Sequence, residues 1–173
     1  YYSKIKNVDQ IIENISNLKN PKGRFDLINF KTNKIIVDYA HTPESISQVI
    51  KYVNPYFSKV VVLFGAGGNR DKEKRKLMGT ASQLADSVIV TNDNPRNEDP
   101  IQISNDILKG CDLSKTTVIL DRKEAITSAI NELKENSVLL VLGKGHEMYQ
   151  EINNSHIPFN DNDFINETIG GLI

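Results

Sequence analysis

The sequence has little of what secreted, metal-binding or membrane-spanning proteins need. It contains one cysteine, Cys111, so no internal disulfide can form, and no Cys/His cluster has zinc-ligand spacing. No apolar run approaches the roughly 18 residues of a membrane span, and the first residues lack the apolar stretch of a signal peptide. We therefore expect a cytoplasmic protein with no metal site of its own and no membrane contact.

The sequence also lacks an excess of either charge. Its 21 Lys and Arg residues nearly balance its 22 Asp and Glu residues and leave a formal net charge of -1. Capture of nucleic acid or of an anionic membrane requires a strongly basic surface, so neither is expected as a partner. Any basic site must therefore be local. The sequence leaves the oligomeric state open, with a monomer as the default.

Several familiar catalytic motifs are also missing. Arg70 stands where the last glycine of G-x-G-x-x-G would be, and no G-K-[ST] follows, which excludes a dinucleotide fingerprint and a phosphate loop. The serine-hydrolase elbow G-x-S-x-G does not occur, and His146 and His156 have no recognisable nucleophile partner. Function must therefore be sought in less common patterns.

What the sequence does have is a regular alternation of aliphatic runs and helical stripes. Runs that are apolar on both faces indicate strands of a mostly parallel sheet covered on both sides. These runs occupy residues 35–37, 60–64, 88–90, 118–120 and 138–142. Stripes at helical spacing lie between them, such as Ile46, Val49, Ile50 and Val53, and Leu77, Ala81, Leu84 and Ala85. We predict a Rossmann-like α/β fold, with a sheet of five to six strands and helices on both faces.

Both ends of the chain add smaller elements to this core. Residues 24–38 predict a hairpin that leads into the first core strand. A polar turn at residues 153–155 predicts a C-terminal antiparallel hairpin, in which Pro158 indicates an edge strand. A short helix over residues 8–18 is followed by a linker signal at residues 20–23.

Four polar segments each follow one of the aliphatic runs. They are DYAHTP at residues 38–43, GAGGNRD at 65–71, DNPR at 93–96 and GKGHE at 143–147. In open parallel sheets the ligand crevice lies outside the carboxyl ends of the strands, so these segments should line one site.

The first segment suits a nucleotide. Asp38 and His41 precede a helix opened by Thr42-Pro43, whose N-terminal amides could hold phosphate oxygens. An equally good alternative is that Asp38 and Thr42 only cap the turn.

The other segments suit an acidic ligand group. Arg70, after a tight glycine turn, and Arg96 could clamp a carboxylate, and Glu147 could meet an ammonium. A surface arginine without a ligand explains Arg96 equally well. The charged run at residues 72–76 is expected to be a solvated helix face.

These segments, in this order and with Gly23-Arg24-Phe25 ahead of them, resemble the C-terminal domain of the Mur ligases, the tripeptide synthetases in particular. The family patterns GR[FM], VDYAHTP, FGxGGxRDxxKR, DNPR and GKGHE are all present, from about residue 24 onward. The resemblance implies an ATP-dependent amide ligase of peptidoglycan synthesis that acts through an acyl phosphate. It also implies that residues 23–173 form the C-terminal domain, and that residues 1–22 end the central ATPase domain and form a linker.

The resemblance further implies a role for individual residues. For ATP, Arg24 would reach the phosphates, Asp38 the ribose and His41 the same region. The amino-acid pocket would comprise Arg70, Asp93, Asn94, Pro95, Arg96, Gly143 and Glu147.

The pocket chemistry favours meso-diaminopimelate as the amino acid that is added to UDP-N-acetylmuramoyl-L-alanyl-D-glutamate. This amino acid ends in a second head with a carboxylate, which suits Arg70 and Arg96, and an ammonium, which suits Glu147. A lysine-adding relative binds a bare ammonium, which two arginines would repel. We therefore predict diaminopimelate over lysine.

The chain lacks other parts of the family pattern: the phosphate loop, the UDP-binding domain and the central-domain residues that hold Mg²⁺. We therefore assign no catalytic residue to this piece and expect it to turn over no ATP by itself. One alternative is a folylpolyglutamate synthetase-like domain, which carries DGAHNP in place of residues 38–43. Another is a non-catalytic module that binds a nucleotide or an amino acid.

Overall fold

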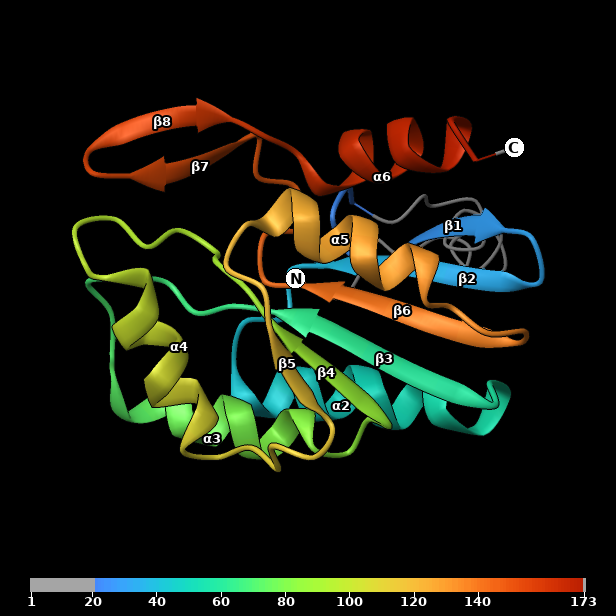
Figure 1. Cartoon of the computed structure of the whole chain (residues 1–173), viewed down its shortest axis with the longest axis horizontal. Coiled ribbons are helices and arrows are strands. Elements are labelled where there is room, and N and C mark those ends of the chain that lie inside the picture. Colours follow the sequence, from blue (N-terminus) through green and yellow to red (C-terminus); the bar gives the residue numbers. More distant parts are fainter. Residues whose placement is uncertain (1–20, 173) are drawn as a thin grey trace, which may run out of the picture.

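The computed structural model describes residues 21–172, and its core is one six-stranded sheet (Figure 1). The strand order is β1 (Asp26–Phe30), β2 (Asn33–Asp38), β6 (Ser137–Leu142), β3 (Lys59–Phe64), β4 (Ser87–Val90) and β5 (Thr116–Val118). Only β1 runs antiparallel to its neighbour, and the other strands pair in parallel. The helix predicted over residues 8–18 lies outside the described residues, as do residues 1–20 of the segment 1–22 that is expected to end the central domain and form the linker.

Helices cover both faces of the sheet, as Figure 1 shows. One face carries α2 (Pro43–Val53) with the short η1 (Asn54–Tyr56), α3 (Glu73–Ser82) and α4 (Pro100–Leu108); the other carries α5 (Arg122–Asn131) and α6 (Asp161–Gly170). A hydrophobic core lies on each face of the sheet, and successive residues of β3 point into opposite cores. Val62 packs in the core under α2, α3 and α4, and Leu63 packs in the core under α5 and α6. The predicted α/β fold is confirmed.

The connections bring together the carboxyl ends of the four parallel strands β2, β3, β4 and β6, after which the four polar segments begin. The chain goes from β2 through α2 to β3, and then outward to β4 and β5. It returns through α5 to β6, which is inserted between β2 and β3. This reversal creates the switch point at which open α/β sheets bind ligands.

Two sequence expectations about the surface were wrong. The edge strand β5 begins at Thr116, ends at Val118 and has Val118 40% exposed, so it is not covered on both faces. In the predicted stripe of α3, Leu77 and Leu84 are also exposed. The helix instead buries Gly79, where an added Cβ atom would lie 2.2 Å from the Ile107 carbonyl oxygen, because α3 packs closely on α4.

The predicted C-terminal hairpin is present as a separate two-stranded sheet. It consists of β7 (Tyr149–Ile152) and β8 (Ser155–Pro158). Its turn residues Asn153 and Asn154 have φ of 49° and 59°, a left-handed conformation that asparagine tolerates.

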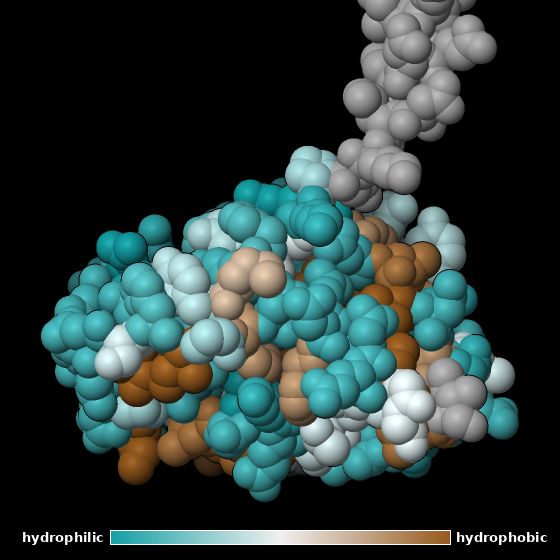
Figure 2. Space-filling model, turned by 90° about the horizontal axis from the view of Figure 1, so that it is seen from above, coloured by the Kyte–Doolittle hydropathy of each residue, from teal (hydrophilic) through white to brown (hydrophobic). Residues whose placement is uncertain are grey.

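The outer surface is largely hydrophilic on the face shown in Figure 2, where the apolar areas are small and separate. None of the helices between residues 21 and 172 is long and apolar enough to span a membrane.

Candidate functional site

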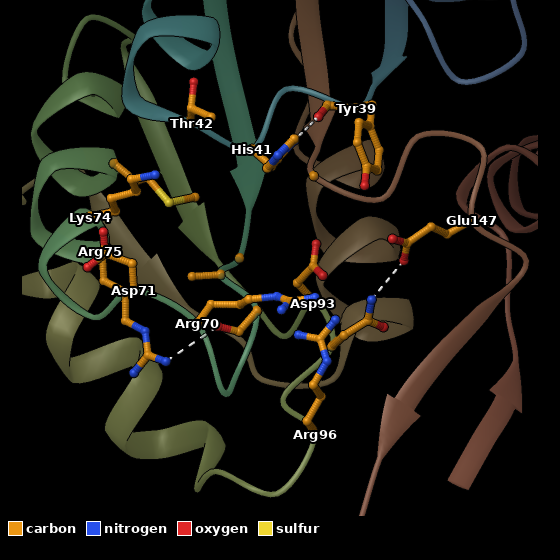
Figure 3. Close-up of a pocket in the computed structure, with 16 residues that line it drawn as sticks. Tyr39, His41, Thr42, Arg70, Asp71, Lys74, Arg75, Asp93, Arg96 and Glu147 are labelled. Carbon is orange, nitrogen blue, oxygen red and sulfur yellow. Dashed lines mark hydrogen bonds between the residues drawn. The ribbon is translucent and has the colours of Figure 1, made fainter. Parts of the chain in front are cut away.

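The four polar segments meet at one cavity of about 350 Å³ beside the carboxyl ends of the strands (Figure 3). The predicted site residues that line it are His41, Arg70, Asp93, Asn94, Arg96, Gly143 and Glu147. The other three, Arg24, Asp38 and Pro95, do not line the cavity. The cavity therefore brings together both arginines and the glutamate of the predicted amino-acid pocket.

The glycine-rich loop after β3 packs directly on the DNPR turn after β4. A Cβ atom added at Gly68 would lie 1.8 Å from the Pro95 carbonyl oxygen, and one at Gly65 would lie 2.2 Å from the Thr91 carbonyl oxygen. The Gly68 N–H also donates to the Asn94 carbonyl oxygen (2.8 Å). Glycine is required at both positions, and Pro95 supports the loop instead of facing the cavity.

A buried ion pair behind this loop corrects the expectation of a solvated helix face at Arg75, whereas Lys72, Lys74 and Lys76 are exposed as expected. The side chain of Arg75 is only 1% exposed, and it pairs with Glu98 (2.9 Å) and Asp106 (3.2 Å). Its guanidinium also donates to the Gly67 carbonyl oxygen (3.3 Å). The hydrogen bond from Arg75 lowers the pKa of Glu98 to about 2, and the Glu98 carboxylate accepts from the Asn69 N–H as well. This pair fixes the glycine-rich loop from behind.

The ammonium of Lys144, which the sequence does not single out, holds two of the predicted pocket residues. The side chain is fully buried, and Nζ donates to Asn94 Oδ1 (3.0 Å), to Glu147 Oε2 (2.8 Å) and to the Tyr149 carbonyl oxygen (2.7 Å). Asn94 Nδ2 donates to the same Glu147 oxygen (2.8 Å). Burial by itself would raise the pKa of Glu147, but the hydrogen bonds from Lys144 and Asn94 outweigh it and hold the pKa below its ordinary value. Glu147 therefore stays ionised.

Asp93 is buried where it lines the cavity. Burial raises the pKa of its carboxyl, and the charges of Arg122 and Lys144 offset only part of this effect. Gly143 makes room for this carboxyl, because its φ is 109° and a Cβ atom there would lie 2.6 Å from Asp93 Oδ2. A larger residue at position 143 would therefore displace Asp93.

A second buried ion pair lies beneath these segments. Arg122 and Asp161 have fully buried side chains that are joined at 2.8 Å. Arg122 also donates to the carbonyl oxygens of Asn92 (3.2 Å) and Leu142 (3.1 Å). These carbonyl groups immediately precede the DNPR and GKGHE segments, so the pair fixes where both segments begin.

Asp38 organises the backbone next to the cavity. Its two carboxylate oxygens accept from the N–H groups of Phe25 (2.8 Å) and Ala40 (2.8 Å). This is the turn-capping role that the sequence offers as an alternative to a nucleotide site. The two roles are compatible, because an ionised carboxylate has about four acceptor positions.

The N-terminus of α2 is less available to a phosphate than the sequence predicts. Thr42 and Ser45 form a capping box, in which each backbone N–H donates to the other side chain (3.0 and 3.2 Å). The first residue of the helix is Pro43, which has no N–H, and Glu44 adds a negative charge in the first turn. The N–H groups of Thr42 and Ser45 are therefore already paired within the chain, and nucleotide binding at this helix end stays a prediction.

Aromatic and cationic groups gather around Tyr39 at this end of the cavity. The Tyr39 ring lies 4.7 Å from the ring of His41 and 5.2 Å from that of His146, centroid to centroid. The Arg24 guanidinium lies 4.8 Å from the Tyr39 centroid. Arg24 does not line the cavity, but its contact with the Tyr39 ring, which does, holds it close by.

Within residues 21–172, no group of three or more His, Cys, Asp or Glu side chains is placed to hold a metal ion.

Comparison with known proteins identifies the family. The family model described as Mur ligase, glutamate ligase domain matches residues 23–145. A UDP-N-acetylmuramoyl-L-alanyl-D-glutamate–2,6-diaminopimelate ligase of Rickettsia montanensis is 45% identical over 165 residues, which are 93% of this chain and 34% of the relative. A solved structure of a ligase with the same name has a TM-score of 0.84 at 37% identity, over 94% of this chain and 34% of that chain.

More distant structures share only the fold. A bifunctional folylpolyglutamate synthase/dihydrofolate synthase from Yersinia pestis has a TM-score of 0.64 at 19% identity, over 82% of this chain and 33% of that chain. The present chain spans about a third of the length of the curated relatives that it matches. Because the family model covers residues 23–145, well over half of the sequence, the chain belongs to the Mur ligase family and contains its glutamate ligase domain.

Proposed function

We propose that the chain is the C-terminal domain of an ATP-dependent ligase that adds meso-diaminopimelate to UDP-N-acetylmuramoyl-L-alanyl-D-glutamate. The observation that carries this proposal is the convergence of Arg70, Arg96 and Glu147 on one cavity. The names of its relatives, which are 2,6-diaminopimelate ligases, support the same substrate.

The amino-acid end of the cavity offers complementary charges to the distal head of diaminopimelate. Arg70 and Arg96 suit its carboxylate, since guanidinium groups bind carboxylates in a planar fork. Glu147 suits its ammonium, because hydrogen bonds from Lys144 and Asn94 converge on Oε2, and no residue between 21 and 172 donates to Oε1. Lysine has no distal carboxylate, so it would leave the two arginines without a partner.

We assign the other end to ATP. Asp38 keeps acceptor positions for ribose hydroxyls, and the cationic Arg24 beside the Tyr39 ring suits an anionic ligand. When bound, ATP supplies the phosphoryl group that activates the substrate carboxylate. Arg24, Asp38 and His41 would bind and orient the nucleotide, while the residues that hold Mg²⁺ and the UDP-sugar dipeptide belong to the part of the relatives that this chain does not cover. We expect a cytoplasmic monomer.

An amino-acid panel with the full-length ligase tests the substrate. Diaminopimelate should support ATP-dependent ligation far better than lysine. Arg96→Lys, which keeps the charge but loses the fork, should raise the KM for diaminopimelate by about 100-fold. The exposed Lys76→Ala is the matched control, because Lys76 does not line the cavity. Preferential use of lysine by the wild-type enzyme would overturn the proposal.

A second measurement tests the assignment of this chain as an incomplete enzyme. The purified 173-residue chain, given ATP, Mg²⁺, diaminopimelate and the UDP-sugar dipeptide, should release no phosphate above the rate without enzyme. Ligation by this chain alone would show that the phosphoryl-transfer groups lie within it.

A further inference from the structure

The C-terminal hairpin is built into the DNPR turn. The Arg96 N–H donates to the Glu151 carbonyl oxygen (2.9 Å), and the Asn153 N–H donates to the Arg96 carbonyl oxygen (2.8 Å). The Glu151 N–H in turn donates to Asn94 Oδ1 (2.9 Å). Strand β7 therefore continues the hydrogen bonding of the turn, through a parallel bridge between Arg96 and Ile152.

This pairing holds Arg96 in an unfavourable backbone conformation. Its φ is 53°, in the left-handed region that residues with a Cβ atom seldom occupy. Such a conformation persists only where the surroundings impose it, and it is common at ligand sites. Here the hydrogen bonds to Glu151 and Asn153 impose it. The hairpin thus fixes the backbone position of Arg96 and the direction in which its side chain leaves the backbone.

The side chain of Arg96 is fixed at two of its three nitrogen atoms. Nε is 2.8 Å from Glu151 Oε2, and Nη1 donates to the Gly68 carbonyl oxygen (2.8 Å). Both partners of the ion pair are only partly exposed, at 20% for Arg96 and 26% for Glu151. A guanidinium has five N–H donors, so the end formed by Nη1 and Nη2 keeps donors for a ligand.

We propose that Glu151 is a positioning residue for the amino-acid substrate. This inference rests on the proposed function and deepens it. Glu151 holds the Nε edge of the Arg96 guanidinium, so that the Nη end is presented to the distal carboxylate of diaminopimelate. The hairpin is thereby part of the specificity site, although Glu151 itself does not touch the ligand and acts through Arg96.

The physical gain is preorganisation. A free arginine side chain samples many rotamers, and immobilising it on binding weakens affinity by up to roughly tenfold. Glu151 removes this loss because it orders Arg96 before the ligand arrives. The opposite possibility is that Glu151 competes with the ligand carboxylate for Arg96. The two roles predict changes of KM in opposite directions.

Steady-state kinetics of the full-length ligase distinguish them. Glu151→Ala should raise the KM for diaminopimelate on the order of tenfold and leave kcat within about twofold. Glu151→Gln, which keeps an oxygen acceptor for Nε, should restore part of the loss. The exposed Glu135→Ala removes a carboxylate far from the cavity lining and should change neither constant. An unchanged or lower KM in both Glu151 variants would overturn the proposal.

A double-mutant cycle separates positioning from a general structural effect. In an Arg96→Ala background, Glu151→Ala should produce no further rise in KM, since the side chain that it orders is gone. Fully additive effects would show that Glu151 acts by another route, which also rejects the proposal. Failure of the wild-type ligase to use diaminopimelate would instead reject the proposed function itself, whatever the Glu151 variants do.

Discussion

The two ends of the cavity are held in different ways. At the amino-acid end, side chains of separate segments bind one another, as when Lys144 joins Asn94 to Glu147 and Glu151 joins Arg96 to the hairpin. At the nucleotide end, the His41 ring donates to the neighbouring Tyr39 carbonyl oxygen (2.8 Å), Asp38 accepts from backbone N–H groups, and the Tyr39 ring contacts other rings and the Arg24 guanidinium, with no ion pair between side chains of the described residues. The first end is crosslinked by charge, whereas the second is held by local contacts.

This difference teaches which half of the proposed reaction the domain can prepare alone. An amino-acid pocket whose charged groups are fixed in advance needs little rearrangement to bind. At the nucleotide end, the His41 and His146 side chains are exposed, so this end is open to groups from outside the domain. Under the proposed function, this contrast would give the domain the specificity for the amino acid and leave part of the nucleotide site to groups outside it.

The largest expected effect comes from breaking the charge network below the amino-acid end. Asp161→Asn leaves the guanidinium of Arg122 buried without its counter-ion, because both side chains are fully buried. Loss of one partner of a buried pair costs about 3–5 kcal/mol of stability. Urea unfolding of the chain, followed by circular dichroism, measures this loss.

An ion pair with one exposed partner provides the control. Lys109→Met removes a lysine that is 62% exposed, and Asp106 keeps Arg75 as its partner, so the expected loss is about 1 kcal/mol or less. If Asp161→Asn and Lys109→Met reduce the free energy of unfolding equally, the buried ion pair beneath the amino-acid end contributes no more stability than the control pair.

The sequence predicts the fold because periodicity is a local signal. The aliphatic runs indicate most of the strands, and α2 begins and ends where Thr42-Pro43 and the stripe that ends at Val53 place it. The convergence of the four polar segments follows from their positions after these strands. The fold and the location of the site are therefore readable from the sequence.

The buried charges are not readable in the same way, because their partners are far away in the chain. Arg75 and Glu98 are 23 residues apart, and Arg122 and Asp161 are 39 residues apart. Each of these arginines lies in a polar stretch that is typical of a solvated surface. Only the tertiary structure shows which charged residues are buried.

A smaller effect is expected where the charge network supports the glycine-rich loop. The pKa of Glu98 is lowered to about 2 from the ordinary 4.5, so its stabilising contribution is fully present above about pH 5. It is lost as the pH falls towards 2, because the unfolded chain takes up the proton first. We expect a loss of about 2 kcal/mol after allowance for partial exposure.

Unfolding free energies at pH 6 and pH 3 measure this contribution. Other carboxylates also titrate in this range, so the relevant quantity is the difference between wild type and Glu98→Gln. The wild type should lose more stability than this variant on acidification, while the exposed Glu135→Gln should behave like wild type. If Glu98→Gln keeps the full pH dependence of wild type, the ion pair does not stabilise the loop.

The smallest effect is expected at the nucleotide end, and it tests whether the two ends are independent. Tyr39→Ala removes the ring that contacts Arg24, His41 and His146. Ring contacts of this kind contribute about 1 kcal/mol, so the KM for ATP of the full-length ligase should rise about fivefold. Tyr39→Phe keeps the ring and should change it little. The KM for diaminopimelate should stay within about twofold of wild type in both variants, because the Lys144 network does not involve Tyr39. If the KM for diaminopimelate rises together with the KM for ATP, the two ends are coupled.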